Sequence, residues 1–376
     1  MTSPYSFHLF LPTPSPTFPN TPDSPTISTI PTSDNTSAPP TDMLSLFWSN
    51  HNQTANNNTI ILSSQTIKKM LQYPTITILL YNFDQLIGSI VTPIIPIRYK
   101  NITHLYGCVT FLCLHSAYRS QGLCPLLINK LKETASSLSI NRAYYLNKHQ
   151  THTTDLPIKT WYRPINFLKA RQAGFHIPPT IKSPSLDDIK ITKITSDIID
   201  SSYSSLLQLI NKNKNKNINI DKESLVFYPT RDQWSSWISS SPSFLVYSTK
   251  PDSTNPDSTK PDSTNPKTSK NQLKAIFSKK RVDVRMNCGT VVNLSLLIFS
   301  IGEGLAIIKG CLKASTESDL MYGYITGDVT LDKVKRIDGV ITKTNVWLSF
   351  NLIYWLLDYM DDQKIINEKE LYIPLL

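Results

Sequence analysis

Cysteine is scarce in this sequence, with five residues in 376. No two of them form a C-x-x-C pair, and the odd number leaves one thiol over in any set of disulfides. We therefore expect no metal site and no disulfide framework, and a reducing, cytoplasmic environment. The five are Cys108, Cys113, Cys124, Cys288 and Cys311.

Long apolar runs are also missing. No segment approaches the roughly 18 apolar residues that a membrane-spanning helix needs. The first residues, Met1-Thr2-Ser3-Pro4, have neither the basic nor the apolar region of a secretion signal. The sequence predicts neither a transmembrane segment nor secretion.

Acidic residues are outnumbered by basic ones, 28 to 38, which gives a formal charge of +10 and a pI near 9.2. This excess suits an anionic ligand, a nucleic acid or an acidic membrane surface, or simply solubility. The lysines are dispersed, however, and the Asn-Lys tract at 211–217 has no interleaved aromatic residues. We expect no nucleic acid partner.

Two segments are too polar to pack. Residues 1–42 are crowded with Pro, Ser and Thr and predict a disordered tail. Between 250 and 266 a short Pro-Asp-Ser-Thr unit recurs, which predicts a disordered insertion over 250–270. The rest is long enough for two domain-sized halves, 43–189 and 190–376.

The remaining patterns predict a mixed α/β fold. Residues 76–80 and 90–95 are β-branched runs joined near 82–84, as in a hairpin that feeds a strand ending at Leu114. A helix and a short strand at 143–146 follow, which completes a β-β-β-α-β order. A helix at 196–211 and a strand at 244–247 are expected in the second half.

The most informative segment is Thr103 to Leu138, which predicts a strand, a short turn and a helix that begins at Pro125. The N–H groups of a first helical turn lack partners inside the helix and attract anions. Gly122 lets the backbone approach a ligand, and Arg119 adds charge. The same residues also fit ordinary helix punctuation beside a solvated arginine. The predicted apolar face of the helix comprises Cys124, Leu127, Ile128, Leu131, Ala135 and Leu138.

This strand and turn resemble a known pattern. An Arg-x-x-Gly-x-small sequence after a strand is similar to the acyl-CoA pyrophosphate loop of the GNAT acyltransferase superfamily. The run from Phe111 to His115 is more specific, because it resembles the Asn-Phe-Leu-Cys-x-His-Lys signature of N-myristoyltransferases. Arg119-Ser120 matches the start of the Arg-Ser-Lys-Arg loop that follows in that family.

Further segments resemble that family at compatible distances. Leu86-Ile87-Gly88 is similar to its Leu-Val-Gly strand, and Phe47-Trp48 to its acyl-CoA-binding N-terminal motif. The segment 161–166 resembles its Trp-His-Arg-Ser-Leu-Asn run. The resemblance is strongest over 86–176, weaker over 228–247 and faint from 319 onward.

The resemblance implies a GNAT-like fold of two pseudo-symmetric halves, the first binding acyl-CoA and the second binding peptide. It implies an enzyme that transfers a myristoyl group from myristoyl-CoA to the N-terminal glycine amine of a protein. Myristoyl-CoA would be the acyl-donor substrate, with no permanently bound cofactor. Glycine-initiated peptides or proteins would be the partners, and the enzyme would act as a monomer.

The resemblance also implies roles for individual residues. The backbone N–H groups of Phe111 and Leu112 would bind the oxygen of the thioester, and the terminal carboxylate of Leu376 would be the base. Taken alone, an apolar C-terminus is more often simply a last strand. The implied acyl-CoA-binding residues are Phe47, Trp48, Phe111, Leu112, Cys113, Leu114, Arg119, Ser120, Gln121, Gly122, Leu123 and Cys124.

The sequence departs from the family at several positions. Thr110 stands for Asn, Gln121-Gly122 for Lys-Arg, and Leu146 for a residue with a hydroxyl group. The run before Asn351 has none of the glycines expected there. Two other interpretations therefore stay open: a GNAT-type transferase for a smaller acyl group, and a catalytically decayed homologue that only binds acyl-CoA.

Overall fold

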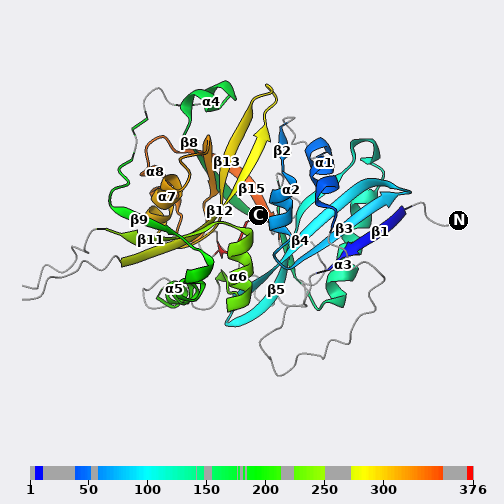
Figure 1. Cartoon of the computed structure of the whole chain (residues 1–376), viewed down its shortest axis with the longest axis horizontal. Coiled ribbons are helices and arrows are strands. Elements are labelled where there is room, and N and C mark those ends of the chain that lie inside the picture. Colours follow the sequence, from blue (N-terminus) through cyan, green and yellow to red (C-terminus); the bar gives the residue numbers. More distant parts are fainter. Residues whose placement is uncertain are drawn as a thin grey trace, which may run out of the picture.

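The computed structural model describes residues 5–11, 39–51, 58–140, 142–147, 155–175, 177, 181–182, 184–212, 224–249, 272–349 and 371–375. Its strands follow one another in the order β1-β3-β4-β5-β7-β15-β8-β14-β13-β12-β11-β9. Figure 1 shows α1 and α3 with the first of these strands on one side of the molecule, and α7 and α8 with the last on the other. The predicted α/β fold with mixed strand pairing is confirmed.

The first half is built on the predicted hairpin, which is confirmed. Its strands β3 (Thr75–Asn82) and β4 (Gln85–Tyr99) are antiparallel, and Ile78 and Leu80 face the opposite side from Leu79. Helix α3 (Leu123–Ser137) packs on the Ile78 side and α1 (Thr41–His51) on the Leu79 side. The two helices thus cover opposite faces of the hairpin.

The predicted disorder of residues 1–42 is wrong for Tyr5–Phe10. These residues form β1, which pairs antiparallel with β3 and is itself the edge strand of the sheet. Tyr5, Phe7 and Leu9 pack on the same cluster as α3. A composition rich in Pro, Ser and Thr over the whole tail hid this short apolar alternation. Residues 12–38 lie outside the described residues.

The single strand predicted up to Leu114 is instead two strands. β5 (Ile102–Cys108) pairs with the far end of β4, and β6 (Thr110–Leu114) pairs with β4 nearer its start. Between them the Val109 N–H donates to the carbonyl of Tyr144 on β7 (Ala143–Asn147), which confirms the strand predicted at 143–146. The break lies at Val109, two residues before Phe111.

The second half repeats the arrangement of the first. β5 and β7 are parallel neighbours with α3 between them in the chain, and β13 (Val291–Gly302) and β14 (Leu320–Tyr324) are parallel neighbours with α7 (Gly304–Lys313) between them. β13 also pairs with β12 (Gln272–Arg285), which pairs with β11 (Ser243–Ser248). β11 confirms the strand predicted at 244–247 and pairs with β9 (Ile189–Lys193).

Strands from both sides of residue 190 meet in the middle of the molecule. β15 (Ile341–Ser349) lies between β7 and β8 (Leu156–Pro164), and β8 pairs on its other side with β14. β10 (Leu225–Phe227) joins β4 to β16 (Leu371–Tyr372), and β2 (Thr59–Ile61) pairs with β12. The boundary at 189/190 stays a prediction. So does the disorder of the insertion at 250–270, which lies outside the described residues.

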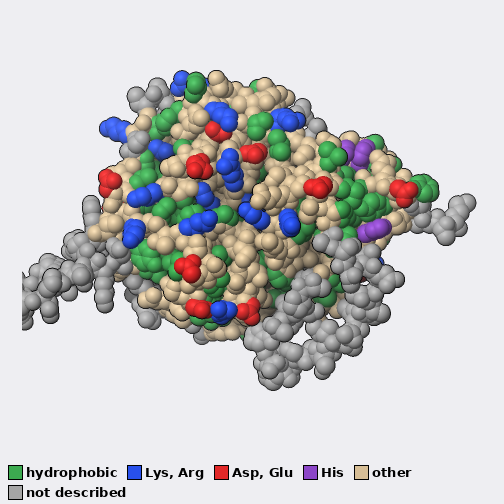
Figure 2. All heavy atoms as spheres, viewed as in Figure 1, with side chains coloured by type: hydrophobic (Ala, Val, Ile, Leu, Met, Phe, Trp, Pro, Cys, Tyr) green, Lys and Arg blue, Asp and Glu red, His purple; other side chains and the backbone are tan. Residues whose placement is uncertain are grey.

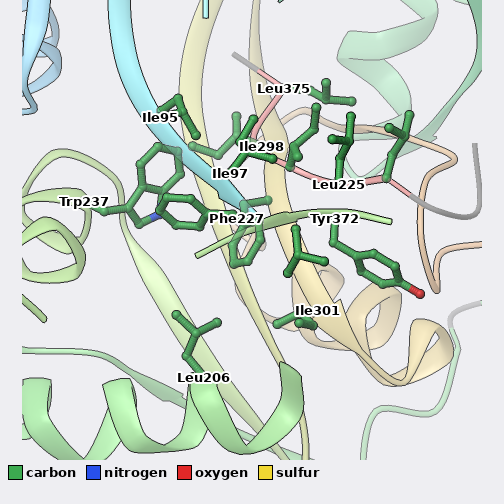
Figure 3. Packing of buried hydrophobic residues seen from close by; sticks show 14 of the residues in the cluster. Ile95, Ile97, Leu206, Leu225, Phe227, Trp237, Ile298, Ile301, Tyr372 and Leu375 are labelled. Atoms are coloured by element: carbon green, nitrogen blue, oxygen red, sulfur yellow. The ribbon is translucent and has the colours of Figure 1, made fainter. Parts of the chain in front are cut away.

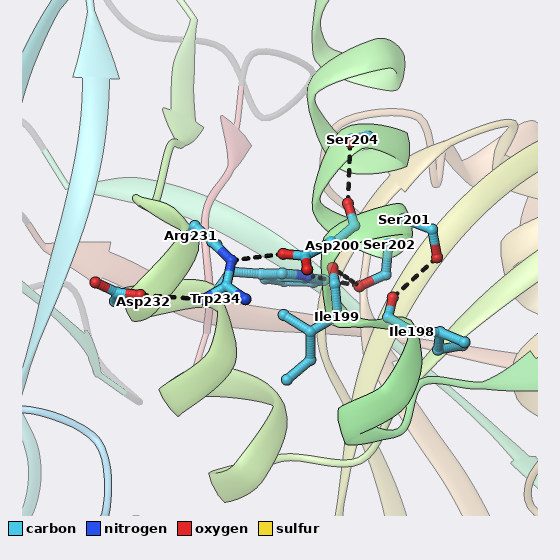
Figure 4. A network of polar contacts seen from close by, with 9 residues as sticks. All are labelled: Ile198, Ile199, Asp200, Ser201, Ser202, Ser204, Arg231, Asp232 and Trp234. Carbon is cyan, nitrogen blue, oxygen red and sulfur yellow. Dashed lines mark hydrogen bonds and ion pairs between the residues drawn. The ribbon is translucent and has the colours of Figure 1, made fainter.

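The helix predicted at 196–211 is confirmed as a 3₁₀ turn (Ser196–Ile198) followed by α5 (Ile199–Lys212). α6 (Arg231–Ser240) packs beside it, because the Trp234 Nε1–H donates to Ser202 Oγ at 3.0 Å and Arg231 pairs with Asp200 (Figure 4). None of the helices in the described ranges has the length and apolar character needed to cross a bilayer. The remaining helices are α2 (Ser64–Met70), α4 (Phe167–Gln172) and α8 (Leu331–Lys335).

A core cluster joins the halves. Ile95 and Ile97 of β4 belong to one cluster with Ile298 and Ile301 of β13 and with Trp237 of α6 (Figure 3). Leu371, Tyr372, Ile373 and Leu375 near the C-terminus belong to the same cluster. The two halves therefore meet in this cluster, beside the separate clusters that each half packs around its own helices.

Candidate functional site

A bulge interrupts the pairing of β6 with β4. Ser89 is opposite Cys113 and Val91 is opposite Thr110, so Ile90 faces both Phe111 and Leu112. Phe111 has a φ of +49°, which is rare for a residue with a side chain. A bulge leaves its extra residue out of the regular ladder. The two residues predicted to bind the thioester oxygen are therefore the two at the bulge.

Aromatic stacking supports the bulge. The rings of Phe111 and Trp48 stack at 4.6 Å between centroids, and the Trp48 Nε1–H donates to Ser89 Oγ at 2.6 Å. Phe47, Trp48 and Cys113 are buried, whereas Leu112 is 40% exposed. Of these predicted acyl-CoA residues, Leu112 alone presents a large open surface, and the other three form its support.

The turn after β6 is held by backbone contacts. His115 begins a 3₁₀ turn (Ser116–Tyr118), and Gln121 donates to the carbonyl of Ala117 at 3.0 Å. The Arg119 guanidinium donates to the carbonyls of Leu114 and His51. Arg119 is therefore held beside the turn by hydrogen bonds to carbonyl oxygens, and no ion pair links it to any described carboxylate.

Helix α3 begins at Leu123 and not at Pro125, which corrects the predicted start. Gly122 is the N-cap with a φ of +75°, a conformation that glycine adopts without strain. Its side lies open, because a Cβ there would meet no atom within 4 Å. Pro125 remains in the first turn, where it fits. The helix start, Gly122 and Ser120, whose φ is +64°, form the predicted anion site.

The apolar face of α3 is close to the predicted one. Leu127, Leu131 and Ala135 are buried as expected, and Leu123 and Thr134 join them. Cys124, Ile128 and Leu138 are only partly buried. Burial raises the pKa of the Cys124 thiol, and it raises the pKa of Cys113 to about 12. Neither thiol is an activated nucleophile.

Two histidines join α1 to the turn. The rings of His51 and His115 lie 4.1 Å apart between centroids. The Ser116 N–H donates to His51 Nδ1, and the Ala117 N–H donates to His115 Nδ1. Burial, and then the charges of His115 and Arg119, lower the pKa of His51. His51 is not among the residues predicted from the sequence, because no local motif marks it.

A lysine of the second half reaches the bulge. Lys280 Nζ of β12 lies 5.2 Å from the centroid of the Phe111 ring. Burial of the ammonium group lowers the pKa of Lys280 to about 7, although the residue as a whole keeps intermediate exposure. This lysine is not among the predicted residues either. The sequence feature that could have identified Lys280 is the run Lys279-Lys280-Arg281 inside a strand. Because side chains alternate along a strand, the middle charge lies on the opposite face from its two neighbours.

The C-terminal residues are fixed in the core. The Leu375 N–H donates to the carbonyl of Ile298 at 2.8 Å, and the Tyr144 hydroxyl donates to the carbonyl of Pro374 at 2.8 Å. Figure 3 shows Leu375 beside Ile298. The predicted base, the carboxylate of Leu376, lies outside the described residues, as does the Asn351 segment.

Within the described ranges, no cluster of His, Cys, Asp and Glu could hold a metal ion. Figure 2 shows that most Lys and Arg side chains on the face drawn lie over the second half, with acidic residues among them. On this face the basic side chains are scattered over the second half, and acidic side chains lie between them.

The arrangement of strands and helices defines a fold of two GNAT-like halves. More narrowly, the fold is that of the N-myristoyltransferases. Three structures of the Saccharomyces cerevisiae enzyme, all with bound myristoyl-CoA, match with TM-scores of 0.58, 0.58 and 0.60 at 12–13% identity. They cover 82%, 88% and 89% of this chain and 75%, 86% and 83% of theirs.

Sequence comparison gives a shorter match. The chain is 30% identical over 79 residues to the glycylpeptide N-tetradecanoyltransferase of Candida albicans. This segment spans 21% of the chain and 18% of that relative. No family model matches the sequence. The chain is thus N-myristoyltransferase-like and divergent.

Proposed function

We propose that this chain transfers a myristoyl group from myristoyl-CoA to the N-terminal glycine amine of protein substrates. The observation that carries the proposal is the bulge at Phe111 and Leu112, which lies between α1 and the start of α3 in a fold shared with enzymes that bind myristoyl-CoA. The proposed setting is the cytoplasm, with a monomer as the active form and no nucleic acid partner.

The bulge supplies the electrostatic part of the reaction. Attack on a thioester places negative charge on the carbonyl oxygen, and main-chain N–H groups fixed in advance stabilise that charge. Losing one such donor costs about 3 to 4 kcal/mol in other enzymes. The side chain of Thr110 is not needed for this role, because the donors are the backbone groups of the next two residues.

The turn supplies the anion site. In the proposed complex the pyrophosphate of CoA lies at the start of α3, where Gly122 leaves the backbone open and the first N–H groups have no side-chain cap. Arg119 and Ser120 flank it. Gln121 contributes no charge, so we expect weaker CoA binding than a loop with Lys and Arg would give.

The nucleophile is the substrate amine itself. A terminal amine has a pKa near ~8 and must lose a proton before it attacks. The carboxylate of Leu376 is the proposed base, and the buried residues before it would hold it in place. Transfer through a cysteine is disfavoured, because burial raises the pKa of both Cys113 and Cys124.

The test is to incubate the purified chain with myristoyl-CoA and a glycine-initiated peptide, and to weigh the product. We expect the peptide to gain one myristoyl group, and a peptide that begins with alanine to gain none. Deleting Leu376 moves the carboxylate back by one residue, about 3.8 Å along the chain. This variant should lose turnover and keep its affinity for myristoyl-CoA.

Two outcomes favour the alternatives. Transfer of an acetyl group with no competition from long-chain acyl-CoA would favour a GNAT-type transferase for a smaller group. Binding of myristoyl-CoA without transfer, unaffected by the Leu376 deletion, would favour a decayed homologue. The departures from the family pattern at Gln121 and Leu146 motivate this alternative.

A further inference from the structure

Lys280 is the one charged side chain of the second half with a described contact to the bulge. Its Nζ lies 5.2 Å from the centroid of the Phe111 ring, within the range of a cation–π contact. Among the described residues, no hydrogen bond or ion pair to a carboxylate accompanies this contact. Burying a charged amine without a counter-ion costs folding free energy. Such a residue is therefore a candidate for a functional role.

The strand fixes the direction of this side chain. On β12 the neighbour Lys279 donates to the carbonyl of Ala314 and to Ser315, on the side of α7. Ser278 and Val282 lie two residues before and after Lys280, on the face opposite to Lys279. Ser278 accepts from the Trp237 indole, and Val282 packs on the cluster of Trp48 and Phe111. Lys280 thus projects into the junction between the two halves.

Desolvation has the largest influence on the Lys280 amine, and Cys108 is the other group that acts on it. Cys108, three residues before Phe111, acts on Lys280 and is buried. Tyr144 on β7 and Tyr324 on β14 lie beside Cys108, and burial raises the pKa of each. Burial therefore dominates, and it lowers the pKa of Lys280 to about 7. Burial thus favours the neutral form of the Lys280 amine, whose lone pair can accept a proton.

The proposed reaction has a second proton to move from the reacting nitrogen to the leaving sulfur. A glycine ammonium loses two protons on its way to an amide, one before attack and one when the tetrahedral intermediate collapses. The carboxylate of Leu376 can hold the first. The leaving sulfur, in turn, needs a proton.

We propose that Lys280 is a catalytic residue that takes the second proton from the reacting nitrogen and gives it to the departing CoA sulfur. The lone pair of Lys280 Nζ accepts the proton, the carbonyl re-forms, and the C–S bond breaks with its electrons going to sulfur. The ammonium then protonates the thiolate, which leaves Lys280 neutral again. A thiol with a pKa near ~8.5 takes this proton favourably. This inference rests on the proposed function.

The experiment compares Lys280→Met, Lys280→Arg and Arg281→Met. Met keeps the apolar stem, Arg keeps the charge but cannot release a proton, and Arg281 is an exposed neighbour on the other face that serves as the matched control. We expect both Lys280 variants to lower kcat by about 100-fold or more. The Kd for myristoyl-CoA should stay within about twofold in all three, and Arg281→Met should keep its kcat.

Three results would overturn the inference. Full activity of Lys280→Arg would mean that positive charge suffices, and full activity of Lys280→Met would mean that the side chain only fills space. NMR titration of the lysine side chains, assigned by the signal missing from Lys280→Arg, gives a readout that does not need turnover or a stable Met variant. A Lys280 that titrates near ~10.4, as a solvated lysine does, rules out the role.

Failure of the wild-type protein to myristoylate any glycine peptide is a different outcome. It would remove the proposed function, whereas the Lys280 variants decide the inference only against an active wild type. The two failures are therefore distinguishable.

Discussion

The indole of Trp48 stacks on the ring of Phe111 at 4.6 Å with the planes 18° apart. Trp48 belongs to α1 and Phe111 to the bulge in β6, so this contact joins a helix near the start of the chain to the two predicted oxyanion donors. The Trp48 indole also donates to Ser89, on the strand that the bulge faces. The shape of the bulge depends on this packing.

Trp48→Ala should therefore reduce both stability and acyl-CoA binding. Removing a fully buried tryptophan costs about 3 to 5 kcal/mol of unfolding free energy. Trp48→Phe, which keeps a ring but loses the N–H to Ser89, should cost about 1 to 3 kcal/mol. Chemical denaturation and calorimetry with myristoyl-CoA measure the two effects. Equal acyl-CoA affinity of a folded Trp48→Ala protein would contradict the link.

Phe111→Gly and Phe111→Ala separate the backbone from the ring. Both lose the ring, but only glycine adopts a φ of +49° without strain. We expect the glycine variant to be the more stable of the two by about 1 kcal/mol. Thermal unfolding of the pair makes the comparison. An alanine variant that is more stable would mean that the bulge relaxes once the ring is gone.

Gly122 and Gly289 form a matched pair for the anion site. Their φ values are +75° and +84°, and at neither position would an added Cβ meet a protein atom within 4 Å. Alanine at either should cost about 1 to 2 kcal/mol of stability. Only Gly122→Ala should also raise the Kd for myristoyl-CoA, by about tenfold, which equals about 1.4 kcal/mol. Equal Kd values for the two variants would place the phosphates elsewhere.

His104 predicts a loss of stability in mild acid. Burial and the charge of Arg142 lower the pKa of His104 to about 4, from about 6.5 in an unfolded chain. The unfolded state therefore binds a proton first as the pH falls from about 6.5, and the folded state loses stability in that window. Because the side chain is half-exposed, we expect only about 1 kcal/mol between pH 7 and 5.

Denaturation of the wild type and of His104→Gln at both pH values checks this. The variant should lose less stability than the wild type over the same interval. A wild type that is more stable at pH 5 than at pH 7 would reverse the expected sign.

Local patterns predicted the local structure. The β-branched runs around 82–84 identified the β3–β4 hairpin, and spacings of three and four identified α3 with Leu127, Leu131 and Ala135 on its buried face. The helix begins two residues earlier than predicted, at Leu123, because Gly122 in the left-handed region acts as its N-cap. Pro125 is compatible with a first helical turn but does not fix where the helix begins.

Long-range pairing was beyond these patterns. Nothing near Val109 indicates that β5 and β6 separate, since the break depends on β7 taking the Val109 N–H. Likewise, Lys280 becomes significant only when β12 lies against the bulge. The predicted residues Phe111 and Leu112 lie together because they are neighbours in sequence, whereas their supports come from elements far along the chain.

The place of β15 between β7 and β8 has a consequence for dissecting the molecule. A fragment that stops before residue 341 would leave two strand edges facing each other without the segment that bridges them, and unpaired edges invite intermolecular pairing. Expressing residues 1–340 alone should therefore yield aggregates. Co-expressing the segment from residue 341 onward as a second chain is the rational way to recover a soluble assembly.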